Sequence, residues 1–214
     1  MEGDLATLGT QLYLYCEVKG GHHWELLPEF SPPYYASGEI VVNVLFPRAG
    51  LPSKPKESGR SVSNPRKPIT ILLAEDARDD QILMKQALQE SRLQNNLYIV
   101  KDGEEVLDYL HRRREYREEA SAPRPDLILL DLYLPKINGL EVLQIIKADS
   151  ALRRIPIVML TTSKAEEDIR RSYELGASSY LTKPMTFELL VEAVNILGEY
   201  WFDIVELPPA STHE

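Results

Sequence analysis

The hydrophobic pattern between residues 69 and 181 is a series of short apolar runs separated by longer amphipathic segments. The first run, ITILLA at 69–74, is nearly continuous, as in a strand that is buried on both faces of a parallel sheet. Four further runs have a similar character. The predicted strands are 69–74, 97–100, 126–130, 155–160 and 178–181.

The segments between these runs repeat their apolar residues at the three- and four-residue spacing of an amphipathic helix. In the first of them the predicted buried stripe consists of Ile82, Leu83, Ala87 and Leu88. Gly176 follows the fourth of these segments and is its expected C-cap, because glycine adopts the left-handed backbone conformation freely. The predicted helices are 79–93, 104–114, 139–147, 165–175 and 186–205.

A strand followed by a helix therefore occurs five times. This alternation is typical of an α/β domain with a doubly wound, five-stranded parallel sheet and helices on both of its faces. We assign residues 68–207 to this domain and residues 208–214 to a disordered tail. A segment rich in Pro, Ser, Gly and Lys precedes the domain at 49–67, and its lack of an apolar period predicts a linker.

Residues 1–48 form an N-terminal extension outside this pattern. Strand-forming residues cluster at 11–18 and 39–46 and predict two strands, and the segment between them is full of strand-breaking residues. Two short strands alone make a marginal unit. Three interpretations of the extension stay open: a short hairpin, a mostly disordered segment, or residues that a misplaced start site adds to the chain.

Composition and charge narrow the class of protein. Hydrophobic residues make up 43% of the chain and charged residues 27%, as in a globular protein. The formal charge of -9 argues against general binding to nucleic acid or to anionic membranes. No apolar run reaches the ~18 residues of a membrane span, and the N-terminus lacks a basic signal region. The single cysteine, Cys16, is typical of a reducing compartment, so we expect a cytoplasmic protein.

Polar residues follow the predicted strands at the points where the strands end. In an open α/β sheet, ligands bind outside the carboxyl ends of the strands, near the point where the strand order reverses. We therefore expect these side chains to converge at one edge of the sheet. They are Glu75 and Asp76 after the first strand, Asp131 after the third, Thr161 and Thr162 after the fourth, and Lys183 after the fifth.

This combination of groups suits phosphoryl transfer. Clustered carboxylates repel one another, so they hold a divalent cation or raise a pKa, and oxygen-only ligands favour Mg²⁺. One carboxylate is then free to attack phosphorus, while the metal ion and the lysine offset charge on the phosphoryl oxygens. A hydroxyl can hydrogen-bond the attached group. We assign Asp79 and Asp80, at the start of the first helix, to N-terminal capping.

Four motifs together resemble the response-regulator receiver family. The most specific is an acceptor aspartate followed by a P-x-x-x-G turn, which Asp131, Pro135 and Gly139 match. The resemblance covers residues 67–207 and implies a flavodoxin-like receiver fold. The motifs are ED at 75–76, LILLDLYLPKINGLEVL around Asp131, IPIVMLTTS around Thr161 and SSYLTKP around Lys183.

The resemblance assigns roles to the acidic residues by their positions. Asp131 is the implied phosphoacceptor. Glu75 and Asp76 are the implied acidic pocket, with Asp76 the better candidate for direct Mg²⁺ ligation. The backbone carbonyl of Tyr133 is the implied source of a further metal ligand.

The resemblance also implies a switch. Lys183 is the lysine that contacts the phosphoryl group, and Thr161 is the switch hydroxyl. Tyr180 occupies the aromatic switch position, where the ring moves inward as Thr161 is drawn to the phosphate. In such a switch the domain has two packing arrangements, and attachment of the charged phosphoryl group shifts the population from one to the other.

A narrower similarity concerns the runs KDGEEVLDYLHRRREY and APRPDLILLDL and the last predicted helix, which ends in YWFDIVELP. They are similar to single-domain regulators paired with bacterial phytochrome-type histidine kinases. This similarity implies such a kinase as the phosphodonor. It also implies a homodimer through the last helix, whose aromatic residues favour an interface. The downstream protein that reads the phosphorylated state is unknown.

Three other functions are alternatives to a signalling switch. A DNA-binding transcription regulator needs a helix-turn-helix module, which we do not expect because only a short tail follows residue 207. A phosphatase of the haloacid-dehalogenase type needs its nucleophile on the first strand in a D-x-D pattern, whereas Asp131 follows the third. A receiver that has lost phosphorylation is disfavoured because the site residues are all present. We therefore expect a protein that is not an enzyme and has neither nucleic acid nor membrane as a partner.

Overall fold

The computed structural model describes residues 10–18, 21–26, 41–47, 68–91 and 93–204 of the 214-residue chain. The chain divides into two compact units, residues 1–66 and 67–214. The predicted linker at 49–67 and the predicted tail at 208–214 lie outside the described residues. Within the described stretches, no helix is both long enough and apolar enough to cross a membrane.

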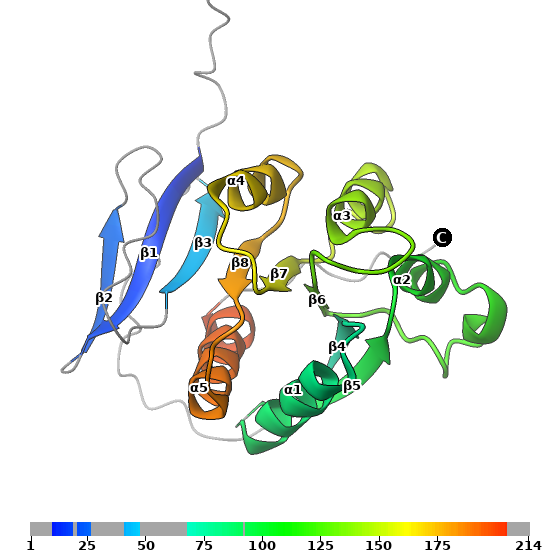
Figure 1. Cartoon of the computed structure of the whole chain (residues 1–214), viewed down its shortest axis with the longest axis horizontal. Helices are drawn as coiled ribbons and strands as arrows, with labels where there is room; N and C mark the ends of the chain where they lie inside the picture. The colour runs from blue at the N-terminus through cyan, green and yellow to red at the C-terminus, as the bar shows by residue number, and fades with distance from the viewer. Residues whose placement is uncertain (1–9, 19–20, 27–40, 48–67, 92, 205–214) are drawn as a thin grey trace, which may run out of the picture. The chain divides into compact units, whose positions relative to one another are not determined.

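Three antiparallel strands make up the described part of the first unit. β1 (Thr10–Val18) pairs with both β2 (Gly21–Leu26) and β3 (Val41–Pro47), in the order β2-β1-β3 (Figure 1). β1 and β3 lie where the sequence predicts strands at 11–18 and 39–46. The local sequence pattern predicts no strand where β2 lies. β2 is extended because it pairs with β1 along its backbone.

The second unit contains a parallel sheet with the strand order β8-β7-β6-β4-β5. Every described strand pair in it is parallel, so the predicted doubly wound, five-stranded sheet is confirmed. In this order the direction of winding reverses between β4 and β6, which lie side by side. The strands are β4 (Ile69–Ala74), β5 (Asn95–Val100), β6 (Leu127–Leu130), β7 (Ile157–Thr161) and β8 (Ser179–Thr182).

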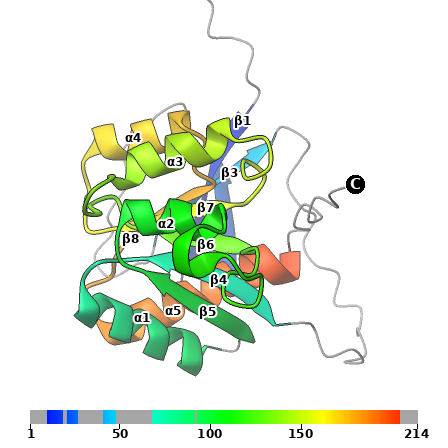
Figure 2. The same ribbon diagram turned by 90° about the vertical axis from the view of Figure 1, so that its right-hand side faces the viewer.

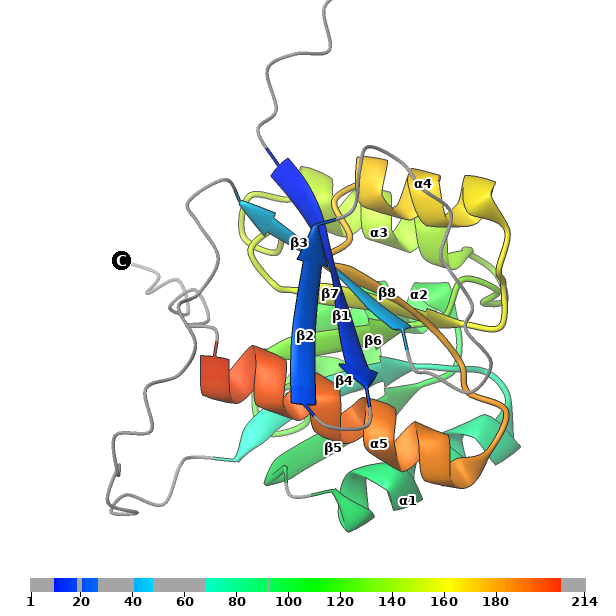
Figure 3. The same ribbon diagram turned by 90° about the vertical axis from the view of Figure 1, so that its left-hand side faces the viewer.

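Helices cover both faces of this sheet. α1 (Arg78–Glu90) and α5 (Phe187–Gly198) lie side by side on one face (Figures 2 and 3). The other face carries α2 (Gly103–Leu110), α3 (Gly139–Ala148) and α4 (Glu166–Glu174) (Figure 2). All residues of β6 and β7 are consequently buried, which explains why the strands appear in the sequence as unbroken apolar runs.

The predicted buried stripe of α1 is partly wrong. Ile82 and Leu83 are 46% and 40% exposed, whereas Met84, Ala87 and Leu88 are buried. The three buried residues are spaced i, i+3 and i+4, and a helix turns by about 100° per residue, which carries Ile82 away from the face of Met84. The three consecutive apolar residues at 82–84 allow two rotations of the helix about its axis. Packing against α5 and the sheet selects the rotation that buries Met84.

Two helix ends show how local backbone conformation sets the boundaries. Gly176 follows α4 with φ of 94°, and its N–H donates to the carbonyl of Tyr173 at 3.0 Å, which confirms the predicted cap. The second predicted helix, 104–114, ends early at Leu110. Arg112 and Arg114 then adopt positive φ values of 51° and 53°, and a 3-10 turn, η1 (Arg114–Tyr116), follows.

The last predicted helix, 186–205, is an α-helix only as far as Gly198. It continues as a π-helix, η2 (Glu199–Ile204), in which Tyr200 and Trp201 are both buried. Their rings meet edge to face, with centroids 5.0 Å apart. These two residues of the terminal aromatic run are therefore enclosed within the chain.

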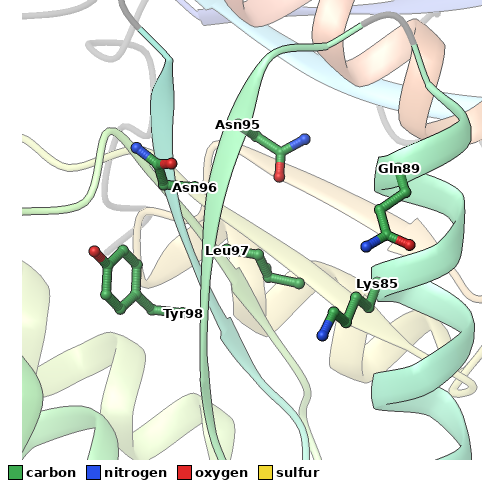
Figure 4. Close-up of a pocket in the computed structure, with 6 residues that line it drawn as sticks. All are labelled: Lys85, Gln89, Asn95, Asn96, Leu97 and Tyr98. Atoms are coloured by element: carbon green, nitrogen blue, oxygen red, sulfur yellow. The ribbon is translucent and has the colours of Figure 1, made fainter.

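A groove of about 440 Å³ lies between α1 and β5 (Figure 4). Its walls come from α1 and from the first residues of β5, at the opposite end of the strand from its carboxyl end. It is therefore separate from the edge of the sheet where the acidic residues gather. The lining residues are Lys85, Gln89, Asn95, Asn96, Leu97 and Tyr98.

Candidate functional site: an acidic pocket with a central lysine

Three carboxylates come together because the two central strands end at the same level. Ala74 at the end of β4 pairs in register with Leu130 at the end of β6. The N–H of Asp131 donates to the carbonyl of Ala74 at 3.1 Å. Glu75 and Asp76 continue from β4, and carboxylate oxygens of Glu75, Asp76 and Asp131 all lie within 4.8 Å of one another. The structure thus brings together the three acids that the sequence singled out.

These carboxylates differ in their access to water. Glu75 is 2% exposed and Asp131 is 6% exposed, whereas Asp76 lies at the surface. Burial raises the pKa of Glu75 above its ordinary value; the Lys183 ammonium opposes the increase and the Asp131 carboxylate adds to it. Three like charges this close favour a divalent cation among them, and an oxygen-only donor set suits Mg²⁺ or a similar hard cation. The residues therefore fit the expected metal.

Lys183, which directly follows β8, contacts these carboxylates. Its backbone N–H donates to the carbonyl of Thr161 at 2.8 Å, which fixes the loop against β7. Its ammonium contacts Glu75 at 2.5 Å, Asp80 at 2.8 Å and Asp131 at 2.9 Å. Burial acts to lower the pKa of Lys183, but the hydrogen bonds to these three carboxylates outweigh it and hold the pKa above its ordinary value.

Asp80 belongs to the site, and its assignment to helix capping is wrong. The N-cap of α1 is Ala77, and no side chain makes a capping hydrogen bond there. Asp79 and Asp80 lie inside the first turn, where Asp80 accepts a hydrogen bond from Lys183. The local sequence carried no signal for this role, because the contact joins Asp80 to Lys183, 103 residues further along the chain.

Thr161 and Tyr180 are linked through Ser163, a residue that the sequence did not single out. Thr161 is fully buried, and its hydroxyl accepts the N–H of Ser163 at 3.3 Å. The Tyr180 hydroxyl donates to the carbonyl of Ser163 at 3.1 Å, and the Tyr180 side chain is buried. Burial raises the pKa of Tyr180 to about 12. In this structure the ring of Tyr180 therefore lies inside the domain.

Tyr133 and Thr162 flank the pocket at the surface. Tyr133 is 59% exposed, and its backbone N–H donates to Asp131 Oδ1 at 3.3 Å. The Tyr133 hydroxyl donates to Asp168 Oδ2 at 3.4 Å, and Ser163 Oγ donates to the same oxygen at 2.5 Å. Asp168 on α4 thus joins the loop after β6 to the loop after β7. Thr162 is exposed.

The P-x-x-x-G turn is packed directly against the backbone of the candidate phosphoacceptor. A Cβ added to Gly139 would lie 2.1 Å from the carbonyl oxygen of Asp131, so the approach requires glycine. Gly103 at the start of α2 approaches the same turn, and its N–H donates to the carbonyl of Pro135 at 3.2 Å. Asn138 caps α3 in a capping box with Glu141. The turn therefore fixes where Asp131 lies.

The fold and this site define a class of protein. The family model for the response regulator receiver domain matches residues 71–195. The chain belongs to that family, and it is a receiver-type response regulator of two-component signalling, a class whose members work with a histidine kinase.

Its relatives include regulators linked to phytochromes. The chain is 43% identical over 148 residues to response regulator Rcp1 of Synechocystis sp., an alignment that covers 69% of this chain and 97% of Rcp1. It is similar to the phosphorylated cyanobacterial phytochrome response regulator RcpA, with a TM-score of 0.61 and 43% identity over 66% of this chain and 99% of RcpA. The bacteriophytochrome response regulator RtBRR has a TM-score of 0.55 and 46% identity, over 68% of this chain and 87% of that one.

These comparisons confirm the resemblance inferred from the motifs, including its narrower part. A solved structure of Rcp1 holds Mn²⁺ and has a TM-score of 0.60 and 42% identity to this chain, over 66% of this chain and 99% of that one. A divalent metal thus binds a relative of the same fold, and the acidic trio of this chain offers a comparable oxygen donor set.

Proposed function

We propose that Asp131 accepts a phosphoryl group from a histidine kinase with Mg²⁺, and that a binding partner, not a substrate, reads the result. The observation that carries the proposal is the contact of Lys183 with both Asp131 and Glu75 at the reversal point of the sheet, beside Asp76. A nucleophile, a fixed cation and metal-binding oxygens are the three parts that phosphoryl transfer to a carboxylate requires.

The chemistry at Asp131 is a displacement at phosphorus. A carboxylate oxygen of Asp131 forms the new bond, the bond from phosphorus to the phosphohistidine nitrogen of the kinase breaks, and that nitrogen keeps the electron pair. Lys183 offsets charge on the transferred oxygens from its place 2.9 Å from Asp131. Bound Mg²⁺ supplies further charge neutralisation. The groups that would hold it are Glu75, Asp76, Asp131 and the backbone carbonyl of Tyr133.

Thr161 and Tyr180 are the proposed switch. The Thr161 hydroxyl is engaged with the N–H of Ser163, and Tyr180 is bonded to the carbonyl of the same residue. When the Thr161 hydroxyl turns to the attached phosphoryl group it gives up Ser163, which changes the loop on which the Tyr180 hydroxyl depends. One local charge event then shifts the population between two packings of this loop.

The proposed partners follow from the relatives and from the last helix. The phytochrome response regulators among the relatives support a phytochrome-type kinase as the phosphodonor. Leu189, Val191 and Ile196 of α5 are only partly buried, and they support a homodimer through the last helix. The downstream partner is an unidentified protein. Cys16 as the single cysteine supports a cytoplasmic location.

The role of a switch and not of an enzyme is part of the proposal. Asp131 follows β6, the third strand of the parallel sheet along the chain, whereas an aspartate-dependent phosphatase of the haloacid-dehalogenase type carries its nucleophile on the first strand along the chain. We therefore expect no turnover of p-nitrophenyl phosphate. Steady release of p-nitrophenol would favour the phosphatase instead.

The test is phosphorylation by acetyl phosphate with Mg²⁺, read as intact mass and followed by size-exclusion chromatography. We expect wild type to gain the mass of one phosphoryl group and Asp131→Asn to gain none, because the amide cannot act as the nucleophile. A larger apparent size of the phosphorylated protein would make the dimer the switched state. Uptake by Asp131→Asn at the wild-type stoichiometry would overturn the assignment of the acceptor.

A further inference from the structure

We propose that the outer edge of β5, together with the groove between β5 and α1, is a docking site for an extended segment of a partner protein that carries an acidic side chain. The inference goes beyond the proposed function, because it concerns neither the acidic pocket nor the switch loop. It follows from the unpaired backbone of β5, from the composition of that strand and from the charge beside it.

The outer edge of β5 offers backbone groups for a further strand. Among the described strands, β5 ends the order of the sheet and pairs only with β4. The carbonyl of Val100 accepts the N–H of Glu75 at 3.0 Å, so the backbone of Val100 faces β4. Successive residues of a strand direct these groups to opposite sides, so every second residue faces away. The outward-facing N–H and C=O groups belong to Asn95, Leu97 and Ile99.

The composition of β5 does not block such pairing. Proteins protect an edge strand from other chains with charged side chains, proline or a bulge. β5 has the sequence NNLYIV, without a charge or a proline, and its register with β4 is unbroken over all six residues. Asn96 is exposed and only Val100 is buried, whereas every residue of β6 and β7 is buried. This edge is therefore open to an extended chain, which would add to the sheet through its own backbone.

The groove beside this edge supplies side chains that a bound segment can contact. Its volume of about 440 Å³ is within the range of about 300 to 1,000 Å³ that is usual for ligand sites. Lys85 and Gln89 point from α1 toward β5, and Leu97 points from β5 toward α1 (Figure 4). Lys85 is exposed, and no residue in the described part of the chain forms an ion pair or a hydrogen bond with its ammonium.

The charge of Lys85 identifies the chemistry of the occupant. An acidic side chain on the bound segment would give this ammonium a counter-charge. A second copy of the chain fits less well, because pairing of two β5 edges would bring two Lys85 side chains to one joint, and like charges oppose association. Charges interact over about 8 Å at physiological salt, so Lys85 and not the net charge of -9 determines which segment binds.

Selection from a phage-displayed library of random peptides of about eight residues tests the proposal on the full chain. We expect the enriched peptides to alternate strand-forming residues and to contain Asp or Glu. A synthetic copy of one should bind Lys85→Glu about three- to tenfold more weakly than wild type, because repulsion replaces attraction. Arg78→Glu is the matched control. It makes the same charge change on α1, outside the groove, and should bind as wild type does. No enrichment, or equal binding to Lys85→Glu, would overturn the proposal.

Amide hydrogen exchange, followed by NMR, locates the bound peptide. We expect the peptide to slow exchange of the Leu97 and Ile99 N–H groups, which face away from β4. Protection elsewhere in the chain without protection here would overturn the proposal. Protection of these groups without peptide would also overturn it. A second copy would then be the occupant if the protection grew with protein concentration, and another segment of the same chain if it did not. Neither measurement requires phosphorylation, so a failure here is separate from a failure of the proposed function.

Discussion

Replacing Gly139 by alanine is expected to destabilise the domain through the backbone of the phosphoacceptor itself. The added Cβ would lie 2.1 Å from the Asp131 carbonyl oxygen and 2.9 Å from the Leu132 Cα. Neither atom belongs to a flexible side chain that could turn away. Gly139 is also tied to this strand end, because its N–H donates to the Leu132 carbonyl at 2.9 Å.

The magnitude follows from the displacement that the methyl group demands. The turn must move by at least about 0.9 Å, the difference between 2.1 Å and the 3.0 Å that real Cβ atoms keep. Over-packing of this kind costs about 3 kcal/mol at the upper end of its usual range. Loss of the Gly139 hydrogen bond adds about 1 kcal/mol. We therefore expect Gly139→Ala to lower the free energy of unfolding by about 3 to 4 kcal/mol.

Urea denaturation followed by circular dichroism measures this loss. With a slope of about 2 kcal/mol per molar urea, the midpoint should fall by about 1.5 to 2 M. Gly198→Ala is the control, because the three atoms nearest to its added Cβ would be side-chain carbons of Leu93 at 3.4 to 3.6 Å, which are ordinary contacts. Its midpoint should change little. A wild-type midpoint for Gly139→Ala would refute the reasoning that backbone contact fixes this turn.

Two predictions concern buried charges and pH. Burial raises the pKa of Glu75 in the folded state above 4.5, its value in the unfolded state. The protonated Glu75 side chain therefore stabilises the fold fully below pH 4.5, and this stabilisation is lost as the pH rises through the pKa of the folded state. Glu75→Gln should therefore melt at a higher temperature than wild type at pH 7 and lose this advantage below pH 4.5; a lower melting temperature at pH 7 would contradict it. Burial lowers the pKa of Lys147 from 10.5 to about 8, so between these values the unfolded state binds more protons and wild-type stability should rise with pH. Lys147→Met should lack this rise, and identical pH profiles of the two proteins would show that the amine is not desolvated.

The strands and the site edge could be predicted because each depends on neighbouring residues in the chain. A strand buried on both faces needs a run of apolar residues, and ITILLA at 69–74 is such a run. Parallel strands expose their carboxyl ends at one edge, so Asp131 and Lys183 had to meet there once the alternation was recognised. Gly176 was predictable for the same reason, since a left-handed helix end is a local requirement.

Other features were decided only by the assembled tertiary structure. The contact between Lys183 and Asp80 joins residues 103 positions apart, and nothing in the local pattern of α1 distinguishes a capping acid from a pocket acid. Ser163 likewise acquires its role only when Thr161 and Tyr180 are placed on either side of it.

The sequence by itself determined the order of the elements, the sheet and the edge at which its polar residues gather, because periodicity and turn chemistry are local properties of the chain. Tertiary structure alone decided the rotation of α1 that exposes Ile82, and the early end of α5 at Gly198. Both depend on which of several locally equivalent arrangements packs best against neighbouring elements, and that choice is made between residues far apart in sequence.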